Sequence, residues 1–389
     1  MARKMKDSGI EWIGEIPEGW SIARGKHILT LLQRAVSPTD GVITCFRDGE
    51  VTLRSNRRED GFTVSLKEIG YQGIEPGDLV VHGMDGFAGS IGISDSRGKS
   101  SPVLVVLDSS QDKKYLMYYL RSMAYNNVFL ALSTGIRVRS CDLKWNKLAD
   151  LLYLVPSLVE QHKLVIFLDE KCSEIDSMLS QTRSSIEEYK KLKQAVITQA
   201  VTTLNCPNVK LKYLMDIIVD CPHETPIYTF TGNYLVIRTS DQSLASLRCD
   251  EDMYRLDEAE YKKRTRRLTL DKDDIVYGRE GSWGLACLVP QSNKYCLGQR
   301  VMQFRCNTRL LYPKYAMYAL NSETVYMQGA LDTIGSTAPH VNISTICNYL
   351  LPVPALTEQK EIADYLDAKC AEIDGLIAKK EQLVKELES

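Results

Sequence analysis

The sequence contains one motif twice, half a chain apart. Residues 155–161 (VPSLVEQ) match residues 353–359 (VPALTEQ), and the match continues through residues 168–176 and 366–374. Both matches have the same offset of 198 residues (353 − 155 = 198). A single repeat at half the chain length indicates a duplication, in contrast to a solenoid of many short units. The chain is therefore expected to fold as two similar halves.

Both copies of the motif predict a long helix. In the first copy Pro156 precedes Ser157 and Glu160, which form a capping-box pattern that marks the start of a helix. In the second copy Ala355 replaces the capping serine, so the start is less clearly marked. Apolar residues then recur at steps of about three and four along each copy. In the first copy these are Leu164, Leu168, Cys172, Ile175, Leu179, Ile186, Tyr189 and Val196; in the second they are Ile362, Leu366, Cys370, Ile373, Ile377 and Val384.

Such a narrow apolar stripe on a long helix indicates a partner helix in place of a broad core. Each copy is the natural partner of the other, in an antiparallel pair. At about 1.5 Å per residue, roughly thirty paired residues would separate the two ends by about 45 Å. Cys172 and Cys370 occupy equivalent stripe positions and are expected to pack in the seam between the helices.

The rest of the chain predicts a mixed α+β module that is used twice. Short apolar runs punctuated by Gly, Pro, Asp and Asn predict strands at residues 79–81, 103–107, 234–237, 274–277 and 301–304. Short helices are expected at residues 113–132 and 313–331. Residues 77–80 resemble residues 273–276, although the loops that follow diverge, which suggests two modules that bind different ligands. The expected domains are residues 1–155 (first module), 156–205 (first long helix), 206–353 (second module) and 354–389 (second, shorter helix).

Composition narrows the class of protein. A chain of 389 residues with 44% apolar residues is expected to form two or three domains with packed cores. No apolar run approaches the length needed to cross a bilayer, so we expect a cytoplasmic protein without membrane contact. The 11 cysteines include no C-x-x-C pair, which favours free thiols and argues against a zinc site. With 48 basic and 50 acidic residues, any binding to DNA must rest on local clusters of positive charge.

The densest such cluster is residues 262–267, with five cations in six positions. A run of this kind can hold phosphates or can simply be a solvated surface. A second basic segment, residues 54–58, favours DNA, and polar side chains nearby could read base edges in the major groove. The candidate DNA-binding residues are Arg47, Arg54, Asn56, Arg57, Arg58, His82, Arg238, Ser240, Lys262, Lys263, Arg264, Arg266, Arg267, Arg279, Glu280 and Ser282. Each could instead be an ordinary turn, ion-pair or structural residue.

The sequence contains no recognisable catalytic or metal motif. Residues 98–100 (GKS) resemble the end of a phosphate-binding loop, but Ile93 stands where that motif requires glycine. The five histidines show no metal-ligand spacing, and neither a G-x-S-x-G motif nor the tetrad of an adenine methyltransferase is present. We therefore expect no catalytic residue, no metal site and no cofactor bound by this chain.

Together these motifs resemble the specificity subunits of type I restriction-modification systems. Residues 6–20 (KDSGIEWIGEIPEGW) are similar to the opening of that family, and the two P-x-L-x-E-Q motifs are similar to the starts of its two helical spacers. Residues 220–223, 237–241, 274–281 and 297–300 resemble segments of its target-recognition domains. The resemblance covers essentially the whole chain.

The resemblance implies an α+β fold in which two target-recognition domains are separated by an antiparallel pair of long helices. Each domain would read one half of a bipartite sequence in double-stranded DNA. Adenine methylation and DNA cleavage would belong to partners: modification subunits, expected to be two, and restriction subunits. S-adenosylmethionine, ATP and magnesium would be bound by those partners. The helices would carry the docking surface, for which Glu160, Gln161, Glu358 and Gln359 are the candidates.

Two departures from the family pattern shape these expectations. Residues 200–202 (AVT) are followed by Thr203 and Leu204 where the family usually continues with Gly and Lys, so the exit from the first helix is altered. The second helix reaches Ser389 before the equivalent of residues 189–202, which predicts a shorter second spacer. The alternative to a DNA reader is a scaffold protein whose helix pair gathers other proteins and whose modules bind peptides.

Overall fold

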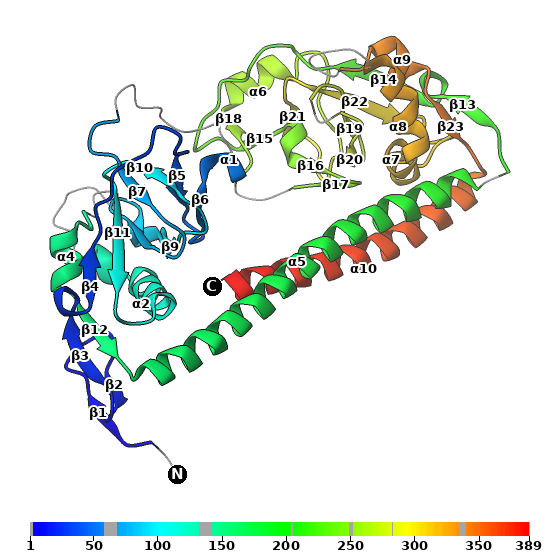
Figure 1. The fold of residues 1–389 in the computed structure, drawn as a ribbon. Coiled ribbons are helices and arrows are strands. Elements are labelled where there is room, and N and C mark those ends of the chain that lie inside the picture. Colours follow the sequence, from blue (N-terminus) through cyan, green and yellow to red (C-terminus); the bar gives the residue numbers. More distant parts are fainter. Residues whose placement is uncertain are drawn as a thin grey trace. The chain divides into compact units, whose positions relative to one another are not determined.

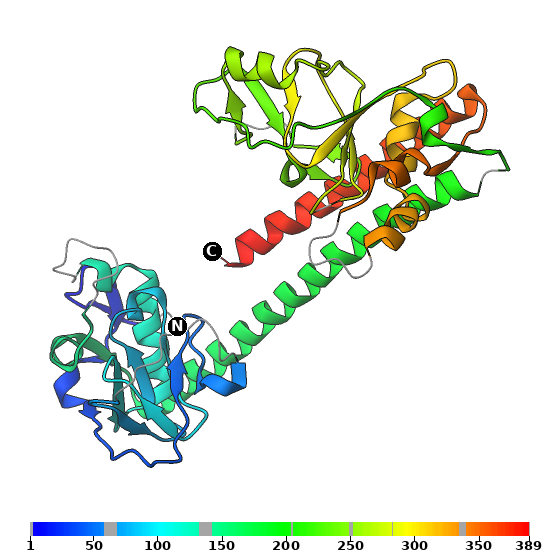
Figure 2. The ribbon, with the colours of Figure 1, turned by 90° about the horizontal axis from the view of Figure 1, so that it is seen from above.

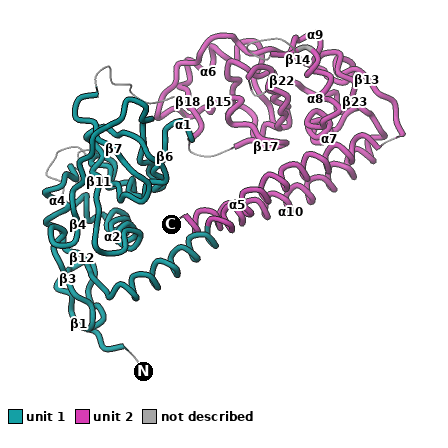
Figure 3. Tube along the Cα trace, in the orientation of Figure 1, with its two compact units in different colours: residues 1–175 teal, residues 176–389 magenta. Residues whose placement is uncertain are grey.

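The computed structural model describes residues 3–57, 68–131, 142–203, 205–248, 252–281, 283–333 and 340–388. These residues form two compact units, Met1–Ile175 and Asp176–Ser389 (Figure 3). The boundary between the units falls within one long helix, α5 (Leu158–Thr202), so each unit contains its own part of that helix. No helix in the described ranges is both long enough and apolar enough to cross a membrane.

Unit 1 is built on a four-stranded antiparallel sheet with the order β4-β11-β8-β9 (Figure 1). The predicted strands at residues 79–81 and 103–107 are confirmed as β8 and β11. The elements of this unit are β1 (Met5–Asp7), β2 (Glu15–Pro17), β3 (Ser21–Arg24), β4 (Leu29–Leu31), β5 (Ile43–Cys45), β6 (Val51–Leu53), α1 (Arg54–Arg57), β7 (Gln72–Ile74), β8 (Leu79–His82), β9 (Ile91–Ile93), β10 (Gly98–Ser100), β11 (Leu104–Ser109), α2 (Lys113–Tyr125), α3 (Val128–Ala131), α4 (Trp145–Asp150), β12 (Leu152–Val155) and the first part of α5.

Both faces of this sheet are covered, which explains why its strands read as continuous apolar runs. Side chains alternate between the two faces of a strand. Leu79 and Val81 belong to the core that contains Leu116 and Leu120 of α2. Val80, between them, belongs to a second core on the opposite face, where it packs with β5 and β6.

Unit 2 repeats this scaffold. Its sheet has the order β14-β22-β19-β20, which corresponds strand for strand to the sheet of unit 1, and α7 packs on one face as α2 does in unit 1. The elements of this unit are β13 (Asn208–Lys210), β14 (Met215–Asp220), β15 (Tyr234–Ile237), β16 (Gln242–Ser243), β17 (Ser246–Leu247), β18 (Arg255–Leu256), α6 (Glu258–Arg264), β19 (Ile275–Gly278), β20 (Ala286–Leu288), β21 (Tyr295–Leu297), β22 (Val301–Cys306), α7 (Pro313–Leu320), α8 (Glu323–Ala330), α9 (Ile343–Cys347), β23 (Leu350–Pro352), α10 (Leu356–Glu388) and the second part of α5. The α+β duplication is therefore confirmed.

The expected helices at residues 113–132 and 313–331 are each two helices. In unit 1, α2 ends before Asn127, which adopts a left-handed backbone (φ 58°) that interrupts a helix. In unit 2, α7 ends at Asn321, whose side chain bonds both backbone groups of Ala286. Ser322 then caps α8 by accepting a hydrogen bond from the backbone N–H of Val325.

The same tyrosine–carboxylate bond holds each module to its long helix. Tyr118 Oη donates to Asp169 Oδ1 at 2.8 Å in unit 1, and Tyr318 Oη donates to Asp367 Oδ1 at 2.8 Å in unit 2. Lys114 and Lys314 pair with the same two carboxylates. Burial raises the pKa of both phenols, which therefore remain donors.

In unit 2 the two long helices lie side by side and antiparallel, as predicted (Figures 1 and 2). Lys193 of α5 pairs with Asp374 of α10 at 2.8 Å, and Arg183 pairs with Glu388 further toward the end of α10. The seam is closed by apolar side chains, among them Ile186, Ile197 and Val201 on α5 and Ala363, Leu366, Cys370 and Ile373 on α10.

Three positions depart from the expectation, and one of them is the predicted stripe residue Ile175, which is 39% exposed. Lys193 is 7% exposed, although it interrupts the apolar pattern, because its aliphatic stem packs in the seam while its ammonium meets Asp374. Cys370 is buried as expected, whereas Cys172 is exposed. The expectation of seam packing is therefore wrong for Cys172. The nine cysteines in the described ranges are free thiols.

Candidate nucleic-acid interfaces

In unit 2 the sheet brings several loops to one edge. Asp220, at the end of β14, pairs with Met302, and Gly278, at the end of β19, pairs with Val301 at the start of β22. The loops that follow β14 and β19 and the loop that precedes β22 therefore meet at the same strand ends. These loops carry three of the four segments that resemble target-recognition domains. We refer to this region as the unit 2 edge.

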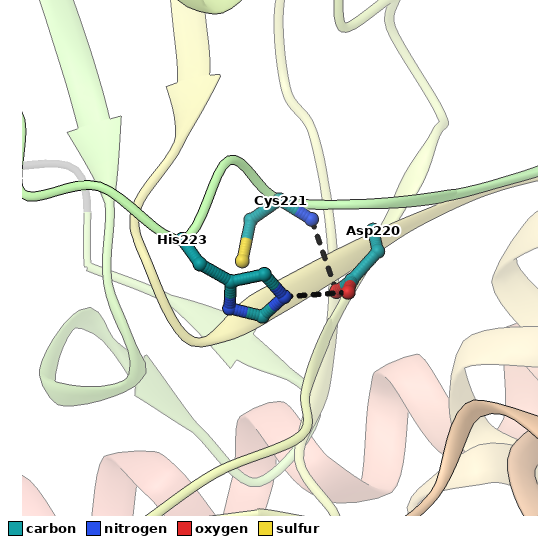
Figure 4. Close-up of side chains that lie close together, drawn as sticks. All are labelled: Asp220, Cys221 and His223. Carbon is teal, nitrogen blue, oxygen red and sulfur yellow. Dashed lines mark hydrogen bonds and ion pairs between the residues drawn. The ribbon is translucent and has the colours of Figure 1, made fainter.

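A cluster of three side chains lies at this edge (Figure 4). His223 Nε2 lies 2.9 Å from Asp220 Oδ2, and the backbone N–H of Cys221 donates to Asp220 Oδ1 at 3.0 Å. Their possible ligand atoms all lie within 4.8 Å of one another, which raises the question of a metal ion.

The surroundings of this cluster fit a metal poorly. Arg279 Nη2 lies 3.4 Å from the Asp220 carboxylate and 3.3 Å from His223 Nε2, so a guanidinium already supplies the positive charge. Burial raises the pKa of Cys221 to about 11, which keeps it a neutral thiol and a poor ligand. The cluster is better described as a hydrogen-bonded group of polar side chains at the edge.

Arg279 is buried at this edge, where its guanidinium contacts several polar side chains. It is 8% exposed, and Nη2 also donates to Glu280 Oε1 at 2.9 Å. Its guanidinium therefore orients the side chains of Asp220, His223 and Glu280. The expectation that Arg279 contacts DNA is wrong, because its guanidinium is buried, whereas Glu280 is partly exposed. The sequence assigned no role to His223, which is exposed, or to Gln299, which accepts a hydrogen bond from Thr225 Oγ1 at 2.8 Å.

Arg238 and Ser240 follow β15, whose end lies beside the end of the parallel strand β21. Arg238 Nε and Nη2 donate to the buried carboxylate of Asp241 at 3.0 and 2.9 Å. The flat face of its guanidinium lies 3.8 Å from the ring centroid of Tyr254. Arg238 is thus held rigidly, and Ser240 is exposed beside it.

The basic run at residues 262–267 is divided by the structure. Lys262 pairs with Glu258 at 2.7 Å and Lys263 pairs with Glu224 at 3.1 Å, both at the surface. Arg266 and Arg267 are exposed, and neither pairs with another residue in the described ranges. These two are the members of the run that remain available for phosphates.

Arg264 requires a correction, because it is 7% exposed and cannot serve as a surface phosphate contact. Its guanidinium donates to the carbonyl oxygens of Pro222, Glu224, Leu297 and Gly298 at 2.9–3.3 Å. It therefore ties together the loops of the unit 2 edge. In the sequence it stood among surface cations and gave no sign of burial.

In unit 1 the candidate residues surround a groove of about 860 Å³. Three arginines line it, each held by a neighbour. Arg47 pairs with Asp85 at 3.1 Å, Arg57 pairs with Asp48 at 2.6 Å, and Arg54 Nε lies 3.3 Å from Thr44 Oγ1. Asn56, on the same short helix, donates to Thr52 Oγ1 at 2.9 Å.

His82 ends β8 inside this groove in a defined tautomer. Its Nδ1 accepts hydrogen bonds from the backbone N–H groups of Met84 and Asp85, at 3.3 and 3.0 Å. Burial lowers its pKa, so the ring is neutral and carries its proton on Nε2. The groove thus contains a histidine that can donate, and none of the described residues accepts from its Nε2.

Two further candidates, Arg58 and Ser282, lie outside the described residues.

The four expected docking residues behave differently from one another. Gln161 and Gln359 are fully buried, so the expectation that they contact a partner is wrong. Each amide side chain bonds its own module instead: Gln161 accepts from the backbone N–H of Asp112 at 3.0 Å, and Gln359 accepts from that of Tyr312 at 2.7 Å. Glu160 pairs with Arg3 at 2.5 Å, and Glu358 is exposed.

Comparisons with known proteins agree on one class. Residues 220–386 match the family model described as "Type I restriction modification DNA specificity domain". The type I restriction enzyme StySPI specificity subunit of Salmonella potsdam is 23% identical over 406 residues, which cover 93% of this chain and 84% of that protein. The chain is thus a two-module protein that contains a DNA specificity domain.

Solved structures share the fold over nearly the whole chain. One, from a study titled as the structural basis of complex assembly and conformational transition of the type I R-M system, has a TM-score of 0.70 with 16% identity and covers 96% of this chain and 95% of its own. The HsdS subunit of Thermoanaerobacter tengcongensis has a TM-score of 0.55 with 15% identity and covers 96% of both chains. Over most of its length the chain is therefore similar to type I restriction-modification specificity subunits, and residues 220–386 match the DNA specificity domain of such proteins.

Proposed function

We propose that this chain reads a bipartite DNA sequence for a type I restriction-modification complex, with one module for each half-site. The observation that carries the proposal is that both units present different polar side chains on equivalent strand ends of the same scaffold. Strand β8 ends in His82, within a groove lined by arginines, whereas the equivalent strand β19 leads into Arg279 and Glu280. Two modules that share a fold but carry different contact residues suit a DNA target whose two halves differ in sequence.

Recognition by these side chains rests on hydrogen-bond chemistry at base edges. Arg54, Arg57 and the Nε2–H of His82 offer donors, which suit the acceptor edge of guanine in the major groove. Glu280, Gln299 and His223 at the unit 2 edge offer acceptors as well as donors. Arg266 and Arg267 would contact phosphates, which strengthens binding without selecting sequence.

The long helices would fix the gap between the two half-sites. Support comes from the matching bonds of Tyr118 and Tyr318, which attach each module to its helix in the same way. The exposed surfaces of these helices would bind partners, for which Glu358 is a candidate and Glu160 contributes through its pair with Arg3. We propose two modification subunits, which bind S-adenosylmethionine and methylate adenine, and restriction subunits that use ATP and magnesium to cleave DNA in the cytoplasm.

Mapping methylated adenines in a genome that expresses this chain with its modification partner tests the proposal. The expected result is two short defined half-sites separated by a constant gap. Methylation at a single continuous site, or without sequence preference, would contradict it. The purified chain alone, incubated with labelled S-adenosylmethionine and DNA, should transfer no methyl groups.

The scaffold alternative makes a different prediction about salt. If the modules bind peptides, any association with DNA should be weak and unspecific. If they read DNA, log K for the target should fall linearly with log salt concentration, by about 0.9 for each phosphate contacted. A flat salt dependence at the mapped target would favour the scaffold.

A further inference from the structure

Unit 2 exposes a group of large apolar side chains beside its recognition loops. Ile227 is 71% exposed, Tyr228 38%, Tyr254 45%, and Phe230 is fully exposed. We refer to these four residues as the aromatic patch. Scattered apolar residues are common on protein surfaces, but an adjoining group that contains a fully exposed phenylalanine suggests a binding surface.

Contacts join the aromatic patch to the unit 2 edge. The ring of Tyr228 meets that of Tyr254 edge-on, with 4.4 Å between centroids, and Tyr254 lies under the guanidinium of Arg238. On the other side of the loop, Thr225 donates to Gln299. The patch and the candidate base-reading residues therefore form one continuous surface.

The loop that carries Phe230 is held in place on both sides of that residue. The backbone N–H of Thr229 donates to the carbonyl of Arg255 at 2.9 Å and so extends the edge of the sheet beyond β18. Gly232 passes so close to that strand that an added Cβ would lie 2.0 Å from the carbonyl oxygen of Leu256. Phe230 therefore projects from an anchored turn, which lowers the entropy cost of presenting it to a ligand.

Cationic side chains border the patch, and two of them are also paired with carboxylates: Arg238 with Asp241 and Lys263 with Glu224. The guanidinium of Arg238 lies over the ring of Tyr254, and Arg255 Nη1 donates to the carbonyl oxygen of Gly232 at 3.4 Å. Arg267 lines a small cavity together with Asp220 and Pro222. Aromatic rings set among cations are suited to stack on bases while the cations hold phosphates.

We propose that Phe230, which projects from the same loop as Tyr228, inserts into duplex DNA and stacks against a base-pair step that it opens. This inference rests on the proposed function and adds a contact of a different kind, since it involves a base face in place of a base edge. Opening a step costs least at flexible pyrimidine–purine steps. Unit 2 should therefore select for such a step in or beside its half-site without a hydrogen bond to either base.

The test uses the full chain assembled with its modification subunits and a duplex that contains the mapped target. 2-Aminopurine, whose fluorescence rises when it is unstacked, is placed in turn at each position of the unit 2 half-site. The unmodified protein should raise the fluorescence several-fold at one step. Phe230→Ala should abolish that rise and weaken binding by about tenfold or more, because the stacking contact between the ring and a base is lost. Phe230→Leu should keep part of the rise, since aliphatic side chains also act as wedges.

Tyr213 provides a matched control. It is 64% exposed, has the ammonium of Lys212 5.2 Å from its ring, and lies just before the start of β14, at the opposite end of that strand from Asp220. Tyr213→Ala should leave both fluorescence and affinity unchanged. Since Phe230 and Tyr213 are both exposed, neither substitution should alter the unfolding curve.

The outcomes separate the two proposals. The stacking inference is overturned, and the proposed function stands, in either of two cases. In the first, the assembled protein binds its mapped target tightly but 2-aminopurine fluorescence rises at no position. In the second, Phe230→Ala raises the fluorescence as much as the unmodified protein does. If Phe230→Ala instead loses its modification subunits with DNA fluorescence intact, the patch is a protein contact and the inference again fails. If the assembled protein prefers no sequence at all, the proposed function fails as well.

Discussion

The two units share a scaffold and differ at the strand ends where that scaffold meets solvent. The bonds that attach module to helix recur in both, as Tyr118 with Asp169 and as Tyr318 with Asp367. The two units differ at the unit 2 edge and its counterpart in unit 1. Strand β4 of unit 1 ends at Leu31, whereas β14 of unit 2 continues to Asp220, whose carboxylate contacts His223 and Arg279. Duplicated residues therefore hold the fold, and the residues that differ lie at the strand ends.

Arg264 ties together the loops of the unit 2 edge, and its removal should have the largest effect on stability. Arg264→Ala leaves four carbonyl groups at the unit 2 edge without their donor, so the free energy of unfolding of unit 2 should fall by about 3 kcal/mol. Hydrogen exchange should show the loss in unit 2 and not in unit 1. The neighbouring substitution Lys263→Ala, which removes only a surface pair, should cost less than about 1 kcal/mol. Equal effects of the two would contradict the structural role of Arg264.

The buried glutamines test whether the duplicated attachments are equivalent. Gln161→Ala leaves one backbone N–H and one backbone carbonyl without partners, and Gln359→Ala leaves one backbone N–H and two backbone carbonyls; each should cost about 2 kcal/mol in its own unit. Gln181→Ala, at an exposed position of α5, should cost almost nothing. Denaturant unfolding of the three variants measures this. A large difference between the first two would show that the attachments have diverged in strength.

Recognition should respond to one module at a time. Arg54→Ala removes a donor from the unit 1 groove, while Arg279→Ala releases Asp220, His223 and Glu280 from their common partner. Each should relax the preference within one half-site, by about 1–3 kcal/mol at the affected base pair, and leave the other half-site unchanged. Sequencing of methylated sites from the two variants provides the measurement. If either variant relaxed the sequence preference at both half-sites, the assignment of one half-site to each module would be contradicted.

The smallest effect is expected from the exposed cations. Arg266→Gln with Arg267→Gln should weaken binding about equally for every sequence and lower the salt slope by about 2, because two phosphate contacts are lost. Binding measured over a range of salt concentrations checks this. Lys262→Gln, which alters a residue already paired with Glu258, should change the slope less.

Periodicity predicted the scaffold well because it depends on residues that recur at regular steps. The strands, the duplication and the antiparallel helices all follow from such spacing. Lys193 was missed because a lysine in an apolar stripe looks like an interruption, and only Asp374 on the other helix explains its burial. The breaks near Asn127 and Asn321 were missed because neither residue lies beside a glycine or proline.

The candidate sites were predicted less well, since charge in a sequence does not reveal burial. Arg264 and Arg267 stand three residues apart in one basic run, yet one is enclosed by carbonyl groups and the other is exposed. The role of His82 depends on two backbone N–H groups that fix its tautomer, a detail of turn geometry. His223 and Gln299 reach the edge only because antiparallel pairing brings distant loops together.

The most direct test of two independent readers is an exchange of one module. Residues 206–353 are replaced by the equivalent segment of a type I restriction-modification specificity subunit with a different target, and methylated adenines are mapped in cells that also express the modification subunits. We predict that one half of the methylated sequence changes to that of the donor while the other half is unchanged. A change in both halves, or in neither, would contradict the assignment of one half-site to each module.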